Sequence, residues 1–169
     1  MPEPKKEPAG SFFHERDDGA EGTWIAHCDG GAAPNPGAMA LGAVITSPAG
    51  EVHQLSQRLP GSGCNNESEW RASLAVLAFV LQQGAQGLVL HTDSTQVRDQ
   101  LSAPDAPALP HALQQLADEA RSLVTQLKRF QVQWIPRHRN SHADALARAA
   151  LGLPPKPVQT PHPKRKRRG

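Results

Sequence analysis

The 169-residue sequence predicts an α/β fold, in which helices flank a five-stranded sheet of mixed strand direction. Two observations support this prediction. Three apolar, strand-like segments follow one another before residue 60 with only turn residues between them, which is typical of an antiparallel meander. After residue 65, helical periodicity alternates with two short strand-like segments, which is typical of right-handed crossovers. The expected order is strand, strand, strand, helix, strand, helix, helix, strand, helix.

The predicted strands are apolar runs that end at turn residues. Two glycines and two prolines follow Asp29, which places this carboxylate at or near the end of the first strand. The second and third strands are joined by the tight turn Pro48-Ala49-Gly50, and residues 61–63 are expected to form a loop. The five predicted strands cover residues 24–30, 38–47, 51–59, 88–91 and 130–135.

Apolar residues that recur every three or four positions mark the helices. In the longest of them these residues are Trp70, Leu74, Leu77, Val80 and Leu81. The four predicted helices cover residues 66–83, 92–101, 112–127 and 140–151.

Composition divides the chain into a core-forming body and two tails. Residues 1–22 are charged, contain Pro and Gly and lack apolar periodicity, so we expect a disordered N-terminal extension. Residues 23–153 are expected to form one domain. Residues 154–169 hold six Lys or Arg and no acid, whereas residues 1–153 have a net charge of −4, so we expect a basic disordered tail.

Two cysteines, Cys28 and Cys64, are too few for a disulfide scaffold and favour a reducing compartment. We therefore expect a cytoplasmic protein without a structural disulfide. No apolar run is long enough to span a bilayer, so no membrane partner is expected. The chain is expected to be a monomer.

Four carboxylates lie at the edges of predicted elements: Asp29, Glu69, Asp93 and Asp144. Strand C-termini and the helix N-termini beside them share one edge of an open α/β sheet, so the four acids could meet there. Each acid alone has a structural explanation, as a turn former, a helix cap or a residue suited to a first helical turn. Together, without a compensating Lys or Arg, they would repel one another and raise their pKa values unless cations bind. Carboxylate oxygens favour the hard cations Mg²⁺ and Mn²⁺.

These residues lie in motifs that resemble type 1 ribonuclease H over roughly residues 24–151. The matching motifs are, in order, Asp29-Gly30 with Asn35-Pro36-Gly37, Asn65-Asn66-Glu67-Ser68-Glu69, Thr92-Asp93-Ser94, and Trp134 through Ala147 with its Ala143-Asp144 pair. Any single motif is weak, but the four together at compatible spacing are highly specific. The chain resembles the compact form of the family, because residues 102–107 stand where some members have a Lys-rich handle. No separate N-terminal hybrid-binding domain is expected from 22 polar residues.

The resemblance implies a ribonuclease H-like sheet and an endonuclease that hydrolyses the RNA strand of RNA–DNA hybrids, leaving 5′-phosphate and 3′-hydroxyl ends. It implies a two-metal mechanism with two Mg²⁺ ions, with Mn²⁺ as a substitute. By the same resemblance Asp29 bridges both ions, Asp144 serves the water-activating ion, and Glu69 with Asp93 holds the second. The implied partner is the RNA–DNA hybrid.

Selectivity for the hybrid must come from 2′-hydroxyls and groove shape, because backbone contacts carry no sequence information. The resemblance assigns Asn35 and Asn66 to the minor groove. Gly30 is expected to let the protein backbone approach a 2′-hydroxyl, because glycine has no Cβ to block it.

His138 is the candidate for the family's mobile histidine, which assists proton transfer or product release, and His142 is its rival. Two residues depart from the family pattern around the paired asparagines. Cys64 stands where the family often has Thr, and Glu67 stands where some members have Arg. Both changes should weaken binding of the DNA strand of the hybrid.

The basic run at residues 162–168 has two interpretations of about equal weight, a salt-sensitive phosphate contact and a solubilising end. It also resembles a nuclear localisation signal, a pattern with many false matches. The alternative function for the whole chain is a catalytically weak hybrid-binding module of the same fold. Fold sharing would also allow an integrase or a junction resolvase, but the motifs at residues 65–69 and 143–147 argue against both.

Overall fold

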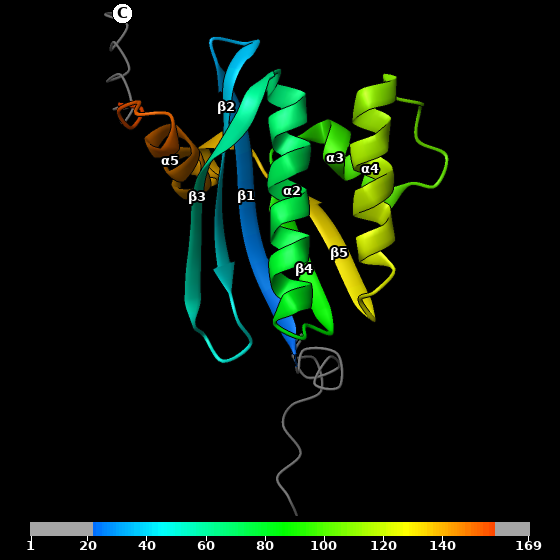
Figure 1. Cartoon of the computed structure of the whole chain (residues 1–169). Coiled ribbons are helices and arrows are strands. Elements are labelled where there is room, and N and C mark those ends of the chain that lie inside the picture. The colour runs from blue at the N-terminus through cyan, green and yellow to red at the C-terminus, as the bar shows by residue number, and fades with distance from the viewer. Residues whose placement is uncertain (1–21, 158–169) are drawn as a thin grey trace, which may run out of the picture.

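The computed structural model describes residues 22–157, which form one five-stranded sheet with helices on both faces (Figure 1). Strands β1 (Thr23–Ala33), β2 (Gly37–Thr46) and β3 (Val52–Gly63) form an antiparallel meander. Strands β4 (Gly87–Thr92) and β5 (Arg129–Trp134) continue the sheet parallel to β1, which gives the order β3-β2-β1-β4-β5. The predicted mixed sheet and its element order are confirmed.

Within residues 22–157, four α-helices and one 3₁₀ turn accompany the strands. They are α2 (Asn65–Gln82), α3 (Thr95–Ser102), α4 (His111–Val124), the 3₁₀ turn η2 (Arg137–Arg139) and α5 (Ser141–Ala150). Helix α2 packs on β1, β2 and α4, whereas α5 packs on β1, β2 and β3. Figure 1 shows α2 and α4 side by side on the near face of the sheet.

Two glycines show that α2 and α5 cover opposite faces of the sheet. A Cβ on Gly30 of β1 would lie 2.2 Å from the backbone of Ser68 in α2, and a Cβ on Gly42 of β2 would lie 2.1 Å from the backbone of Ala143 in α5. Gly42 pairs with Asp29, and paired residues share a face while adjacent residues alternate. The side chain of Asp29 therefore lies on the α5 face, and Gly30 lies on the α2 face.

The hydrophobic core lies between the sheet and α2, α3 and α4. Trp70 at its centre is fully buried, and its Nε1 donates a hydrogen bond of 2.8 Å to Oε1 of Gln96, so the indole has no unsatisfied donor. The other large, fully buried side chains of this core include Leu41, Ile45, Val76, Leu77, Val80, Leu88, Leu90 and Val97. This core fixes the strands and the helix that carry Asp29, Glu69 and Asp93.

Two strand ends differ from the prediction. β1 continues to Ala33, because the small residues after Asp29 keep pairing with β2 through Ala33↔Ala38. β3 includes residues 61–63, which were expected to form a loop. The extension contains Pro60 and a register shift opposite Ala38 and Ala40, both of which an edge strand tolerates because one side of it is unpaired.

No helix within residues 22–157 is long and apolar enough to cross a membrane. The predicted N-terminal extension and the basic run at residues 162–168 lie outside the described residues, apart from Gly22. The domain limits at 23 and 153 stay a prediction.

Candidate active site

A cleft of about 1310 Å³ opens where β4 ends and β1 continues. β1 pairs with β4 only as far as Cys28↔Thr92, so Asp29 is the first residue of β1 beyond the end of β4, and Asp93 follows β4 directly. The cleft walls come from β1, the N-terminus of α2, the turn after β4, η2, α5 and the residues after α5. All four predicted acids line it.

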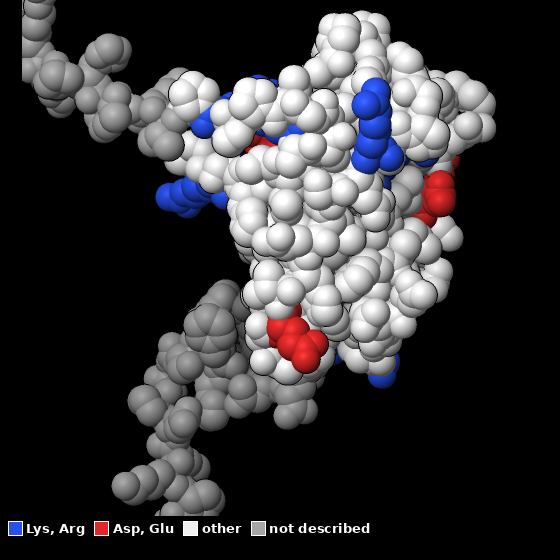
Figure 2. Space-filling view, turned by 60° about the vertical axis from the view of Figure 1, so that its left-hand side comes forward, with Lys and Arg blue, Asp and Glu red and all other residues white. Residues whose placement is uncertain are grey.

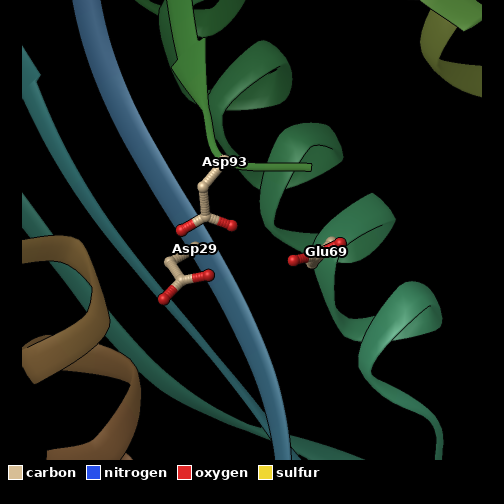
Figure 3. A group of neighbouring side chains, drawn as sticks. All are labelled: Asp29, Glu69 and Asp93. Atoms are coloured by element: carbon tan, nitrogen blue, oxygen red, sulfur yellow. The ribbon is translucent and has the colours of Figure 1, made fainter. Parts of the chain in front are cut away.

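Three of the acids form a tight cluster. Carboxylate oxygens of Asp29, Glu69 and Asp93 all lie within 4.8 Å of one another. Figure 3 shows the three side chains pointing toward one another from β1, α2 and the end of β4. Segments that are 24 to 64 residues apart in the chain therefore place three oxygen ligands around one small volume.

Asp29 is not at a strand end, as the sequence had suggested, because β1 runs on to Ala33. The carboxylate is nevertheless accessible, since no strand pairs with β1 on the β4 side beyond Cys28. The backbone N–H of Gly30 donates a hydrogen bond of 3.0 Å to Oδ1 of Asp29, which helps to fix the carboxylate.

The absence of a Cβ at Gly30 allows β1 and α2 to pack closely. Gly30 is buried, and a Cβ there would lie 2.2 Å from Ser68 and 2.5 Å from the backbone nitrogen of Glu69. Gly31, in contrast, has no atom within 4 Å of an added Cβ. Gly30 and Gly31 both line the cleft, and Gly31 is the one of the two with open space beside its backbone.

Local helix starts position Glu69 and Asp93. Helix α2 begins at Asn65, one residue before the predicted start, because the Cys64 thiol caps it by accepting from the N–H of Glu67 at 3.5 Å. Glu69 therefore lies in the second turn of α2, not the first. Asp93 does not cap α3, because Ser94 Oγ accepts from the N–H of Val97 at 3.1 Å. The carboxylate of Asp93 is left for the cluster.

Asp144 lies in the first turn of α5, as predicted, and approaches Asp29 on the α5 face of the sheet. It is outside the group of three oxygens within 4.8 Å. Its carboxyl group nevertheless shares a hydrogen bond with Asp29, which helps to raise the pKa of Asp29. Asp29 is therefore the acid that lies next to Glu69 and Asp93 and also to Asp144.

Asn140 is a site residue that the sequence interpretation missed. Its side chain is 1% exposed, and Nδ2 donates to the backbone oxygen of Cys28 at 2.8 Å and to Oδ2 of Asp93 at 3.2 Å. Its Oδ1 is buried and has no hydrogen-bond partner among the described residues. The only sequence signal was an Asn just before a helix, which suggests a cap, yet Asn140 makes no side-chain cap bond to α5.

Burial is the main cause that raises the pKa of Asp29 from 3.8 to about 8. Repulsion from Asp93, Asp144 and then Glu69 adds to it. Burial is also the main cause that raises the pKa of Glu69 from 4.5 to about 7. A hydrogen bond with Ser94 lowers the pKa of Glu69, while Asp93 raises it further.

Three cations of the described residues line the cleft, Arg137, Arg148 and Lys156, although the sequence suggested none near the acids. The charge of Arg137 in η2 lowers the pKa of Glu69. Nζ of Lys156, after α5, lies 3.4 Å from Oδ1 of Asp144. Elsewhere, on the face drawn in Figure 2, the Lys and Arg side chains are scattered rather than gathered in one patch.

The two histidine candidates lie in different places. His138 in η2 is exposed and lines the cleft. His142 in α5 is also exposed, but its Nε2 lies 3.0 Å from Nε2 of Gln54 on β3, away from the residues that line the cleft. The position of His138 suits contact with a bound substrate better than that of His142.

The paired asparagines join the end of β1 to the start of α2. Asn65 Oδ1 accepts from the N–H of Ala32 at 2.8 Å, and Asn35 Oδ1 accepts from the N–H of Asn65 at 3.1 Å. The amide NH₂ of Asn35 and the exposed side chain of Asn66 remain at the cleft wall. Asn65 is thus a structural link, whereas Asn35 and Asn66 offer polar groups to the cleft.

The prediction that no disulfide forms is confirmed, because Cys28 and Cys64 are both free. Cys28 points into the core beside Ser73 rather than into the cleft, and burial raises the pKa of its thiol to about 12. Cys64 lines the cleft at the start of α2. The carboxylate of Glu67 pairs with Nε of Arg71 at 3.6 Å, which partly balances its charge.

The donor set fits a divalent cation. Its ligand atoms are carboxylate oxygens, which hard cations such as Mg²⁺ prefer. Burial, and after it repulsion between the acids, raises the pKa values of Asp29 and Glu69, and a bound cation would relieve that repulsion. Asp29, Glu69, Asp93 and, beside them, Asp144 are the residues that could hold metal.

Comparison with known proteins agrees with this geometry. The profile of a family described as reverse transcriptase-like matches residues 27–150. A bifunctional protein of Mycobacterium tuberculosis is 34% identical over 128 residues, which are 75% of this chain and 35% of that protein. The chain thus spans about a third of the length of this relative.

Two solved structures show the same architecture. RNase H1 from the halophilic archaeon Halobacterium salinarum superposes with a TM-score of 0.70 at 31% identity, covering 77% of this chain and 98% of that one. LC11-RNase H1, solved in complex with an RNA/DNA hybrid, superposes with a TM-score of 0.68 at 25% identity, covering 76% of this chain and 96% of that one. The fold, the acid cluster and these matches together show that the chain belongs to the reverse transcriptase-like family and, within it, to the type 1 ribonucleases H.

Proposed function

We propose that this chain is a metal-dependent endonuclease that hydrolyses the RNA strand of RNA–DNA hybrids and leaves 5′-phosphate and 3′-hydroxyl ends. The observation that carries the proposal is the cluster of Asp29, Glu69 and Asp93, with Asp144 against it, in an open cleft. The likeness to the family supports the RNA–DNA hybrid as the substrate, since one similar RNase H1 was solved with an RNA/DNA hybrid.

The four acids are proposed to hold two divalent ions, Mg²⁺ in the first place and Mn²⁺ as a substitute. Such ions, when bound, lower the pKa of a water and stabilise the leaving oxygen. Asp29 is the proposed shared ligand, because it meets Glu69 and Asp93 on one side and Asp144 on the other. Asn140 would hold Asp93 in place by its bond to Oδ2.

The polar wall of the cleft is proposed to recognise the hybrid. Asn35 and Asn66 carry amide groups that both donate and accept hydrogen bonds, which suits contact with 2′-hydroxyls and base edges in a minor groove. Gly31 offers an open stretch of backbone beside Gly30, and the contact of Gly30 with a 2′-hydroxyl stays a prediction. His138 is the proposed proton-transfer or product-release residue, because its exposed imidazole can accept and donate a proton and lines this wall.

The free cysteines support a reducing compartment such as the cytoplasm as the proposed location. The monomeric state stays a prediction that light scattering would check.

The test is a cleavage assay with Mg²⁺ on three matched duplexes: RNA–DNA hybrid, double-stranded RNA and double-stranded DNA. We expect cleavage of the RNA strand in the hybrid alone, and loss of cleavage in Asp29→Asn. Asp105→Asn, which changes an exposed acid in the loop before α4, is the matched control and should cleave normally. Hybrid binding without cleavage by the unmodified chain would refute the proposal in favour of the binding-module alternative.

A further inference from the structure

Helix α5 ends in a turn that sends the chain back toward the cleft. Gly152 has a φ of +72°, a left-handed conformation that glycine adopts without strain. The N–H of Gly152 donates to the oxygen of Ala149 at 3.0 Å, and the N–H of Leu153 donates to the oxygen of Arg148 at 2.9 Å. This pair of bonds is the Schellman motif, which fixes the direction of the chain after the helix.

A hydrogen bond from the side chain of Arg148 in α5 then holds the segment that follows the helix. Nε of Arg148 donates to the backbone oxygen of Pro154 at 2.8 Å. Three of the residues from 153 to 157 are prolines, whose rings restrict φ and reduce the number of conformations that the segment can adopt. We call residues 153–157 the strap, and Leu153, Pro155, Lys156 and Pro157 all line the cleft of the acids.

The strap places the positive charge of Lys156 beside the carboxylate of Asp144. Nζ of Lys156 lies 3.4 Å from Oδ1 of Asp144, whose side chain is 23% exposed, while that of Lys156 is 59% exposed. The contact joins the end of the strap to the first turn of the helix from which it departs. An ammonium group has three donors and no acceptor, so it can serve this carboxylate only as a cation.

We propose that Lys156 is a built-in competitor of the divalent ion at Asp144, and that the strap thereby sets the metal concentration that the site requires. The inference rests on the proposed function, because it takes Asp144 as a metal ligand. One carboxylate cannot hold the ammonium and a divalent ion closely without placing two positive charges side by side. Metal binding must therefore release Lys156, and the fraction of molecules with the pair formed lowers the apparent metal affinity.

The exposure of the paired side chains sets the size of the effect on metal affinity. An ion pair with one largely exposed partner is weak in water and is screened by salt. Removing it should lower the half-saturating metal concentration by roughly two- to fivefold, not by orders of magnitude. The difference should shrink as ionic strength rises, because screening weakens the pair.

The test is a Mg²⁺ titration of the full, substrate-free chain, followed by the midpoint of thermal unfolding, since a ligand of the folded state raises that midpoint. Lys156→Ala should reach half-saturation at a roughly two- to fivefold lower concentration than the unmodified chain. Lys156→Arg keeps the charge and should behave like the unmodified chain. Lys128→Ala, which removes an exposed lysine just before β5 that does not line the cleft, is the control and should change nothing.

The half-saturating concentration, rather than the midpoint itself, is compared, so a change in basal stability does not decide the result. Equal half-saturation in Lys156→Ala and the unmodified chain, or a higher value in the variant, would overturn the inference. An Asp29→Asn variant in the same series distinguishes failure of the inference about Lys156 from failure of the proposed function. If Mg²⁺ stabilises the unmodified chain but not Asp29→Asn, the metal site stands whatever Lys156 does. If Mg²⁺ stabilises neither, the proposed function fails with the inference.

Discussion

Replacing Asp29 by Asn should stabilise the metal-free protein at neutral and alkaline pH. Asp29 has a pKa of about 8 in the folded chain against 3.8 for the free group, because it is buried among other acids. An acid whose pKa is raised by folding costs no stability at a pH below the pKa that it has in the unfolded chain. As the pH rises from 3.8 to about 8, that cost grows because folding opposes ionisation, and above about 8 it is constant.

The difference of about 4 pKa units, at about 1.36 kcal/mol per unit, sets an upper limit of roughly 5 kcal/mol at alkaline pH. Asp29 is partly open to the water of the cleft, and the Asn amide also costs free energy to bury, so we expect a gain of about 2–3 kcal/mol at pH 8. At pH 4 the variant should gain nothing, because Asp29 is then neutral in the folded chain.

The assay is urea unfolding of both proteins in EDTA at pH 4, 6 and 8, with Asp105→Asn as the control. The gain should increase with pH for Asp29→Asn and stay near zero for the control. Equal stabilities of variant and unmodified chain at every pH would refute the conclusion that Asp29 is held in a repulsive cluster. Adding Mg²⁺ at pH 8 should reverse the order, since the ion stabilises the unmodified chain and finds no Asp29 carboxylate in the variant.

Three further predictions concern the other parts of the site. Asn140→Ala should lower metal affinity and cost about 1–3 kcal/mol of stability in urea unfolding, because Asp93 loses a donor and the buried oxygen of Cys28 is left unpaired; unchanged Mg²⁺ half-saturation would make its role purely structural. His138→Ala should lower turnover roughly 100-fold at saturating Mg²⁺, and His142→Ala should not; the reverse order would exchange their roles. A chain ending at Pro155 should bind the hybrid with a higher Michaelis constant and a shallower salt dependence, with little change in turnover at saturating Mg²⁺, since it loses six basic residues; an identical salt dependence would make the tail a solubilising end.

The element order and the meeting of the acids could be predicted because each depends on a local signal. Apolar periodicity marked the helix around Trp70, and the short run before Asp93 marked β4. Once those elements were assigned, the rule that strand C-termini and helix N-termini share an edge brought Asp29, Glu69 and Asp93 together. The structure confirms the sheet, while the catalytic roles of these acids await the tests above.

What could not be predicted depends on tertiary contacts. The Gly-Gly-Ala-Ala run after Asp29 is typical of a turn, but pairing with β2 outweighs that preference and carries β1 to Ala33. Gly30 suggested an open path for substrate, whereas its close neighbour is the backbone of Ser68. No local pattern shows that a residue after a proline pair, such as Lys156, will return to Asp144.

The measurement that tests the central claim most directly is the cleavage of a hybrid with a labelled RNA strand, with and without Mg²⁺, followed by analysis of the product ends. The account predicts RNA fragments with 5′-phosphate and 3′-hydroxyl ends that appear only with the metal, and an intact DNA strand. Fragments that form equally well in EDTA, or that carry 3′-phosphate ends, would contradict the assignment of the acid cluster as the metal centre of the reaction.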